Sequence, residues 1–123
     1  MSDKGNTQLT IFFTAPPDLV AEGDRIFESH AKWMRAVHSR EGEEALLHYN
    51  VVKGPELSNP MDPSSQLTGN TSFVLTEVYK TPAGVANHWK LTPAWEDFAA
   101  VGAWMSKVKV TTVHGSPVVH SLW

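Results

Sequence analysis

Cysteine is absent from this chain of 123 residues. Without cysteine there is no disulfide framework, no thiolate nucleophile and no metal site built on sulfur. The absence fits a reducing compartment. Residues 1–8 (MSDKGNTQ) also lack the apolar stretch of a signal peptide. We therefore expect a cytoplasmic protein.

The chain also has little excess charge, because its formal net charge is −3 and its ten lysines and arginines are scattered along it. Nucleic acids and anionic membranes favour partners with clustered basic residues. A run of roughly 20 apolar residues, which a membrane-spanning helix needs, is missing as well. We therefore expect neither nucleic acid nor a membrane among the partners.

Sequence motifs of several enzyme classes are missing too. There is no glycine-rich phosphate loop, no Walker motif and no Gly-x-Ser-x-Gly elbow. His30 and His38 share a helical pattern, but they lie about 12 Å apart along the axis at 1.5 Å per residue, which is too far for one zinc ion. We therefore expect no metal site.

Aromatic side chains are what the chain has in quantity. Five tryptophans accompany six histidines, and the 41% hydrophobic content is enough for a single domain, over residues 1–123, with its own core. Tryptophan fills cores, lines pockets for flat ligands and anchors subunit interfaces. Composition leaves these three roles open.

Hydrophobic periodicity predicts the elements. Alternating apolar residues indicate strands, and apolar residues at helical spacing indicate helices. The predicted strands cover residues 8–15, 45–53, 70–80 and 107–113, and the helices cover 17–37 and 81–91, with a further helical piece from Thr92. This β-α-β-β-α-β order is the ferredoxin-like pattern, an α+β fold with an antiparallel sheet and helices on one face.

Three segments lie outside these elements. Residues 1–7 are expected to form a flexible lead, residues 54–69 a long loop and residues 116–123 a C-terminal arm. The long loop is either a pocket lid or a poorly ordered excursion. The arm is apolar, so we expect it to pack on its own sheet or to reach a partner subunit by strand addition.

The stretch of residues 73–88 (FVLTEVYKTPAGVANH) is the one around which the chain is organised. In its strand Glu77 shares a face with bulky apolar residues, so it is either solvated at the strand end or a buried acid with a partner. Thr81 and Pro82 then start a helix as N-cap and first residue. Helical spacing turns His88 inward, back toward the strand.

The other face of the same strand carries Val74, Thr76 and Val78. A sheet with helices on one side leaves this second face to be covered by something else. Packing two such sheets together in a homodimer is the economical solution.

The run Glu77-Val78-Tyr79, followed by residues 83–88, Thr92-Pro93 and the pair Trp95 and Phe98, resembles the antibiotic biosynthesis monooxygenase family of the dimeric α+β barrel superfamily. The resemblance covers most of residues 8–113. It implies a dimer whose two sheets form a barrel, with a pocket in each subunit between sheet and helices. Well-known members oxidise aromatic polyketides with molecular oxygen and no metal, flavin or haem, and others degrade haem.

By position, the resemblance marks Glu77, Tyr79 and His88 as the catalytic residues and implies no cofactor. Haem degradation is disfavoured, because the first strand lacks an evident asparagine and Tyr79 stands where haem-degrading members typically have tryptophan. His88 is then the expected base, Glu77 orients it, and Tyr79 donates a hydrogen bond to the substrate oxygen. The alternative is a buried His88–Glu77 pair that only locks helix to strand.

We expect a pocket for a small aromatic or apolar ligand. The residues expected to line it are Phe12, Trp33, His48, Asn50, Phe73, Trp89 and Trp95. Which face of residues 45–53 points into the pocket stays open, because alternation alone does not say which side is buried.

The predicted function is that of a cofactor-independent monooxygenase, an oxidoreductase acting on aromatic or polyketide-like substrates. One alternative is a cyclase or isomerase of the same superfamily, in which His88 shuttles a proton without oxygen. The other is a non-catalytic dimer that only binds a small ligand.

Overall fold

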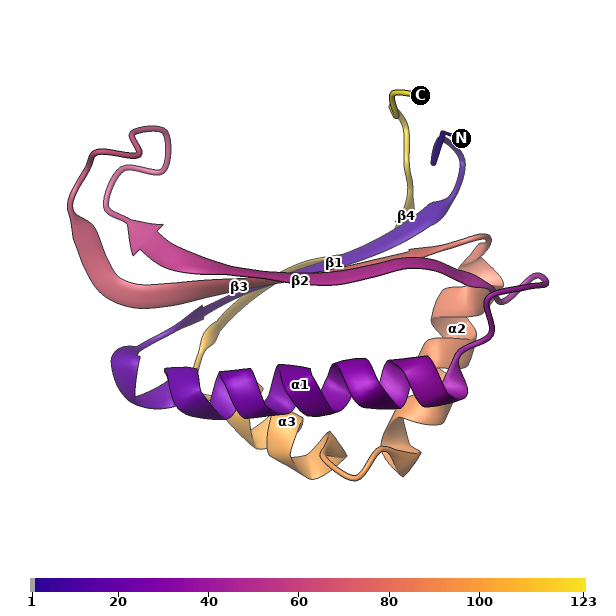
Figure 1. Cartoon of the computed structure of the whole chain (residues 1–123), viewed down its shortest axis with the longest axis horizontal. Helices are drawn as coiled ribbons and strands as arrows, with labels where there is room; N and C mark the ends of the chain where they lie inside the picture. Colours follow the sequence, from indigo (N-terminus) through magenta and orange to yellow (C-terminus); the bar gives the residue numbers. More distant parts are fainter. Residues whose placement is uncertain (1) are drawn as a thin grey trace.

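The computed structural model describes residues 2–123 as a sheet with helices on one side (Figure 1). The elements in chain order are β1 (Thr7–Ala15), the 3-10 turn η1 (Pro17–Leu19), α1 (Val20–Val37), β2 (Leu46–Leu57), β3 (Leu67–Tyr79), α2 (Pro82–Leu91), the 3-10 turn η2 (Thr92–Ala94), α3 (Phe98–Met105) and β4 (Lys109–Pro117). The strands are antiparallel neighbours in the order β2-β3-β1-β4. This confirms the predicted α+β class and antiparallel sheet, and the order is compatible with a ferredoxin-like fold. Among the described residues, no helix combines the length and the apolar character needed to cross a membrane.

The start of α2 follows directly from local sequence. Thr81 is its N-cap, and the Thr81 hydroxyl accepts a hydrogen bond from the backbone N–H of Ala83 at 3.1 Å. Pro82 occupies the first helical position, where a missing N–H costs nothing. Both features were predicted, and together they fix where His88 stands, less than two turns into the helix.

The loop predicted over residues 54–69 is wrong in length. β2 continues to Leu57 and β3 begins at Leu67, with Pro55 paired with Thr71. Proline is tolerated there because β2 is an edge strand, where a missing N–H need not interrupt the ladder. Residues 58–66 connect the two strands, and Figure 1 shows this end of the hairpin curling away from the helices. The hairpin end therefore does not act as a lid on the helix side.

β4 is also longer than predicted. The strand predicted over residues 107–113 continues past Gly115, which forms a bulge, since the neighbouring residues His114 and Ser116 pair with consecutive residues of β1. Glycine suits this position because its φ is +78°, in the left-handed region that other residues adopt less readily.

The two ends of the chain pair with each other just beyond the sheet. The N–H of Val118 donates to the carbonyl of Asn6 at 2.8 Å, and the N–H of Gly5 donates to the carbonyl of Val118 at 2.9 Å. The C-terminal arm thus begins by pairing with its own chain, which was one of the two arrangements predicted for it. The lead expected to be flexible is held at Gly5, and its Met1 lies outside the described residues.

The core lies between the sheet and the helices. Inward-facing Phe13 of β1 and Phe73 of β3 are each 1% exposed. With Phe27 of α1 and Trp104 of α3 they form an aromatic cluster whose ring centroids lie 5.3 to 5.8 Å apart. This layer makes the interior apolar, which raises the cost of any ionised group placed in it.

Within residues 2–123, no helix covers the other face of the sheet (Figure 1). Phe12 of β1, Val52 of β2 and Val113 of β4 are 44%, 61% and 57% exposed. Val74 pairs with both Phe12 and Val52 and therefore shares their face. The predicted outward orientation of Val74 is confirmed.

Gly84 offers a test of how closely α2 packs on β3. A Cβ atom at this position would lie 2.5 Å from Cδ1 and 2.9 Å from Cβ of Tyr79, both side-chain atoms of a buried residue. We expect Gly84→Ala to lower the free energy of unfolding by about 1–3 kcal/mol, as overpacking does, measured by urea denaturation.

The matched control is Gly102→Ala in α3, where an added Cβ meets nothing within 4 Å. This variant should be neutral or more stable by up to about 1 kcal/mol, because alanine favours the helix. Equal effects of the two substitutions would show that α2 does not press on Tyr79.

Candidate functional site

Five polar side chains meet under the sheet at its α2 end. β3 supplies Glu77 and Tyr79, α2 supplies His88, α1 supplies His30, and His38 is the C-cap residue directly after α1. Glu77 and Tyr79 are fully buried, and His88 is 2% exposed. The predicted buried position of Glu77, one of two alternatives, is thus the observed one.

His30 and His38 reach the site from α1 and from its C-terminal end. His30 and Met34 are four residues apart on one buried face of α1, and buried His38 follows as the C-cap, with its backbone N–H donating to the Met34 carbonyl. This face and the end of the helix are turned to the sheet and α2. His38 was not predicted to take part, although its spacing from His30 was a visible signal.

A chain of hydrogen bonds assigns the protons of His38 and His88. Nδ1 of His38 lies 3.2 Å from the carbonyl oxygen of Met34, which only accepts, so His38 Nδ1–H is the donor. In neutral His38 the other nitrogen, Nε2, is then an acceptor, and His88 Nδ1–H donates to it at 3.0 Å. Neutral His88 is left with a free lone pair on Nε2.

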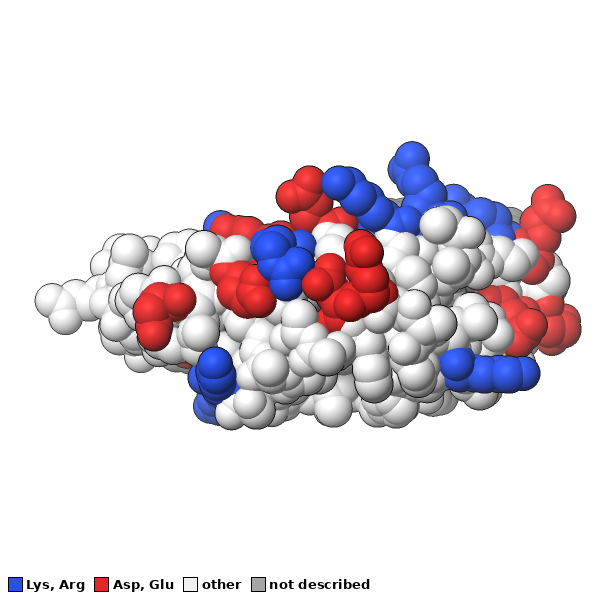
Figure 2. Space-filling view, turned by 90° about the horizontal axis from the view of Figure 1, so that it is seen from below, with Lys and Arg blue, Asp and Glu red and all other residues white. Residues whose placement is uncertain are grey.

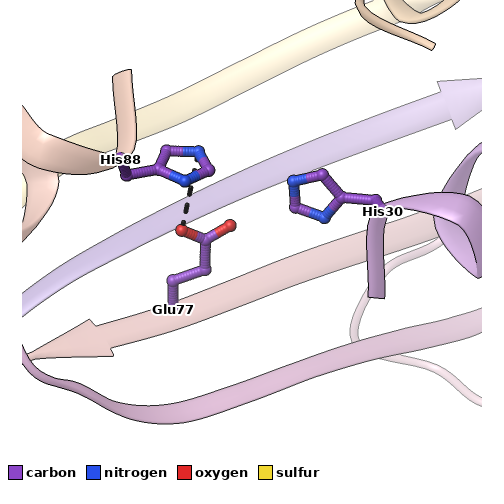
Figure 3. A group of neighbouring side chains, drawn as sticks. All are labelled: His30, Glu77 and His88. Carbon is purple, nitrogen blue, oxygen red and sulfur yellow. Dashed lines mark ion pairs between the residues drawn. The ribbon is translucent and has the colours of Figure 1, made fainter. Parts of the chain in front are cut away.

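That lone pair faces Glu77. His88 Nε2 lies 3.8 Å from Glu77 Oε1, and Figure 3 shows both side chains converging on the ring of His30. Glu77 Oε1 also accepts a hydrogen bond from the hydroxyl of Tyr79 at 2.5 Å. Glu77 Oε2 is buried and has no hydrogen-bond partner among the described residues.

His30 completes the group from the opposite side. Its Nδ1 shares a hydrogen bond of 2.8 Å with the hydroxyl of Tyr49 on β2. Burial raises the pKa of Tyr49 above its usual value, and the nearby Glu77 adds to this, so the hydroxyl stays protonated. Tyr49 was not among the predicted site residues, because the inward face of β2 could not be assigned from alternation.

Burial keeps the acid and the bases of this group neutral. It raises the pKa of Glu77 to about 7, against a smaller lowering by the Tyr79 hydroxyl. Burial lowers the pKa of His88 to about 3, aided by the neighbouring histidines, and lowers that of His30 to about 4. The contact between His88 and Glu77 is therefore, below pH 7, one between a neutral imidazole and a carboxylic acid.

A small cavity of about 70 Å³ touches His30 and His88. The other residues around it are apolar or aromatic except for Thr92; they are Leu9, Ile11, Phe13, Ile26, Phe27, Leu75, Trp89, Trp95, Phe98, Val101 and Met105. Trp89 and Phe98 are 37% and 45% exposed, so this part of the cavity wall lies at the molecular surface. Trp89 also stacks on His114 of β4, with ring centroids 5.2 Å apart.

Of the seven predicted pocket residues, three lie at or beside the cavity and four do not. Trp89 and Trp95 line the cavity, and the ring of Trp33 stacks on Trp95 and lies 5.7 Å from that of His88. Three of the others, Phe12, His48 and Asn50, point to the far face of the sheet, where cross-strand pairing places them with Val74, Val78 and Thr76. The seventh, Phe73, packs against Phe27 and Trp104 in the aromatic cluster and does not itself line the cavity. These four assignments were wrong because the inward face of each strand, and the position along it, depend on which side the helices cover.

Tyr79 also differs in its role. It was expected to donate a hydrogen bond to a substrate, but its hydroxyl donates to Glu77 and it does not line the cavity. Tyr79 therefore positions the carboxyl group.

A larger groove on the helix side, of about 630 Å³, is of a different kind. Its walls include Arg25, which pairs with Glu22 at 2.6 Å and with Asp97 at 3.0 Å. Figure 2 shows acidic and basic side chains next to one another on this side of the molecule. Charges that neutralise each other at an exposed surface leave little for a ligand to bind, so the candidate site is the buried group and not this groove.

No protein-family model, no curated protein and no solved structure matches the chain. The resemblance to the antibiotic biosynthesis monooxygenase family therefore stays a prediction.

The pKa of Glu77 makes a prediction about stability and pH. Unfolded, this carboxyl group titrates near 4.5, whereas in the folded protein its pKa is about 7, so the folded state loses stability as pH rises from 4.5 to 7. Glu77→Gln has no carboxyl group at this position, so its folded state does not lose this stability as pH rises. We expect the variant to gain stability over the parent, by up to about 3 kcal/mol, between pH 4.5 and 7.5, measured by urea denaturation at each pH.

Glu56→Gln is the control with the opposite sign. Hydrogen bonds from Thr68 and Asn70 lower the pKa of exposed Glu56, so this variant should lose stability relative to the parent as pH rises through the carboxylate range. A Glu77→Gln difference that is flat with pH would mean that the folded protein does not perturb the Glu77 carboxyl group.

Proposed function

We propose that the protein is a small-molecule enzyme, resembling the cofactor-independent monooxygenases, that removes a proton from a small apolar substrate and oxidises it with molecular oxygen. The observation that carries the proposal is the free lone pair of His88 Nε2, held beside the carboxyl group of Glu77 and next to an apolar cavity. A base in such a place can act on a C–H or O–H bond of a substrate from which water is excluded.

In the proposed reaction the proton passes from an electron-rich substrate, such as a phenol or enol, to His88 Nε2. The substrate anion gives one electron to oxygen, and the resulting radical pair closes to a peroxide with a new C–O bond. Loss of water from the peroxide leaves a carbonyl group. One oxygen atom enters the product and the other leaves as water, so oxygen is the sole oxidant.

The residues around His88 support this role. When Nε2 takes up a proton, Nδ1–H still donates to His38, which in turn stays fixed on the Met34 carbonyl. Burial disfavours the imidazolium, and Glu77, which ionises above pH 7, would offset that charge once the proton has moved. Tyr79 fixes Glu77 from the other side. The site thus holds the base and the carboxyl group in one geometry before a substrate arrives.

The volume of the cavity limits the substrate. About 70 Å³ is well below the roughly 300–1,000 Å³ of pockets that enclose drug-sized ligands. The proposed substrate is therefore small, or it inserts only its reacting end after Trp89 and Phe98 move aside. A small space walled by tryptophan and phenylalanine equally favours the second candidate, a protein that binds a small apolar molecule without reacting with it.

The proposal includes a homodimer that buries the far face of the sheet. Phe12, Val52 and Val113 form an exposed apolar surface that water alone would cover in a monomer. Beyond Val118 the C-terminal arm exposes Leu122 and Trp123, which would reach the second copy. Two such sheets packed face to face form the barrel expected from the resemblance.

Removal of the base tests the catalytic proposal. With a panel of phenols and enols, we expect oxygen uptake at an electrode and equimolar product formation, and His88→Ala should lower turnover by about 10²–10⁴-fold. His48→Ala, on the far face of the sheet, removes a histidine without touching the cavity and should leave turnover within about twofold. Undiminished turnover in His88→Ala would remove His88 from the mechanism, and product without oxygen uptake would identify an isomerase.

A charge on the sheet face tests the dimer. The parent protein should sediment as a dimer at micromolar concentration, and Val113→Lys should weaken association by at least about 100-fold, because each copy then buries an ammonium group. Val37→Lys, at a valine that ends α1 and is 41% exposed, is the control and should remain dimeric. A monomeric parent would exclude the barrel.

A further inference from the structure

Three potential metal ligands converge in the buried group. His30, Glu77 and His88 each present one donor atom, and the three atoms lie within 4.8 Å of one another. Figure 3 shows the two imidazole rings on either side of the carboxyl group, one from α1 and one from α2, with the carboxyl group from β3. These three elements lie far apart in the sequence, so the grouping is a product of the fold.

An independent observation shows that this group is incomplete. Glu77 is fully buried, yet its Oε2 has no hydrogen-bond partner among residues 2–123. A buried oxygen without a partner is destabilising, and more so when the group is charged, so natural proteins seldom leave one unpaired. The oxygen belongs to the same carboxyl group that His30 and His88 flank.

The surrounding contacts are those that orient metal ligands. A ligating histidine commonly engages its second nitrogen with a carboxylate, a carbonyl or another polar group, and this contact aims the first nitrogen at the metal. His88 engages His38 through Nδ1, and His30 engages Tyr49 through Nδ1. Glu77 is steadied by Tyr79. Each of the three candidate ligands therefore has its own positioning partner.

We propose that His30, Glu77 and His88 bind one divalent transition metal ion, with zinc as the reference case. Two imidazole nitrogens and one carboxylate oxygen suit zinc or iron(II) and not calcium or magnesium, which prefer all-oxygen sites. Ligand bonds of about 2.1 Å put donor atoms about 3.0–3.5 Å apart, so the side chains close by about an ångström around the ion. Three protein ligands leave a further position open toward the cavity.

Metal binding and the proposed proton abstraction exclude each other. Both use the lone pair of His88 Nε2, so a bound ion would occupy the base and leave the protein inactive in metal-free oxygenation. The inference therefore goes beyond the proposed function, and it predicts a second, metal-loaded state of the same site. Its test needs no substrate, so failure of one proposal does not decide the other.

Zinc binding to the chelator-treated protein, followed by isothermal titration calorimetry in a buffer that does not bind zinc, is the test. We expect one zinc ion per chain. His30→Gln, Glu77→Gln and His88→Gln should each lower zinc affinity by at least about 100-fold, and His38→Gln, which removes only a positioning partner, by about 10–100-fold. His48→Gln on the far face of the sheet is the control and should bind zinc as the parent does.

A measurement on the parent protein guards against variants that fail to fold. On adding zinc, the ring nitrogens of His30 and His88 should shift in a histidine ¹⁵N NMR spectrum, while those of His48 and His120 should not. Cobalt(II) should give visible absorption bands of a site with nitrogen and oxygen ligands. No zinc uptake, or uptake that shifts only His48 or His120, would overturn the proposal.

Discussion

The removal of Glu77 from water governs the rest of the site. An isolated carboxylate in an apolar interior is costly enough that the group either holds its proton or recruits a positive partner. Here the aromatic core on one side and the sheet above leave Tyr79 as its one hydrogen-bond donor among the described residues. The same burial lowers the pKa of His88 and of His30, so the imidazoles beside the carboxyl group are neutral as well.

The long helix contributes more than packing. From α1 and its C-cap, His30 contacts Tyr49 and His38 contacts His88. The carbonyl of Met34 sets the direction of the hydrogen-bond chain that ends at His88. A backbone carbonyl cannot donate, so it acts as a fixed reference for the tautomers that follow. The tautomer of His88 is thus determined by a backbone carbonyl of α1, two hydrogen bonds away.

Much of the fold follows from local patterns in the sequence, and less of the site does. Alternation located the strands, and Thr81 with Pro82 located α2 and hence His88. The end of β2 was missed because Gly54 and Pro55 look like a turn, whereas an edge strand tolerates both. Glu77 and His88 lie close in sequence and were found together. His38 and Tyr49 join them only through the crossing of α1 over the sheet, and the lining roles given to Phe12, His48 and Asn50 failed for the same reason.

The stacking of Trp89 on His114 joins the edge of the sheet to the candidate base. The ring of Trp89 stacks on His114, which lies on the edge strand β4, and also meets the ring of His88 edge-on, with centroids 4.9 Å apart. Aromatic contacts of this kind contribute about 0.5–1.5 kcal/mol each. A change at His114 would therefore reach the cavity wall and His88 through a single indole ring.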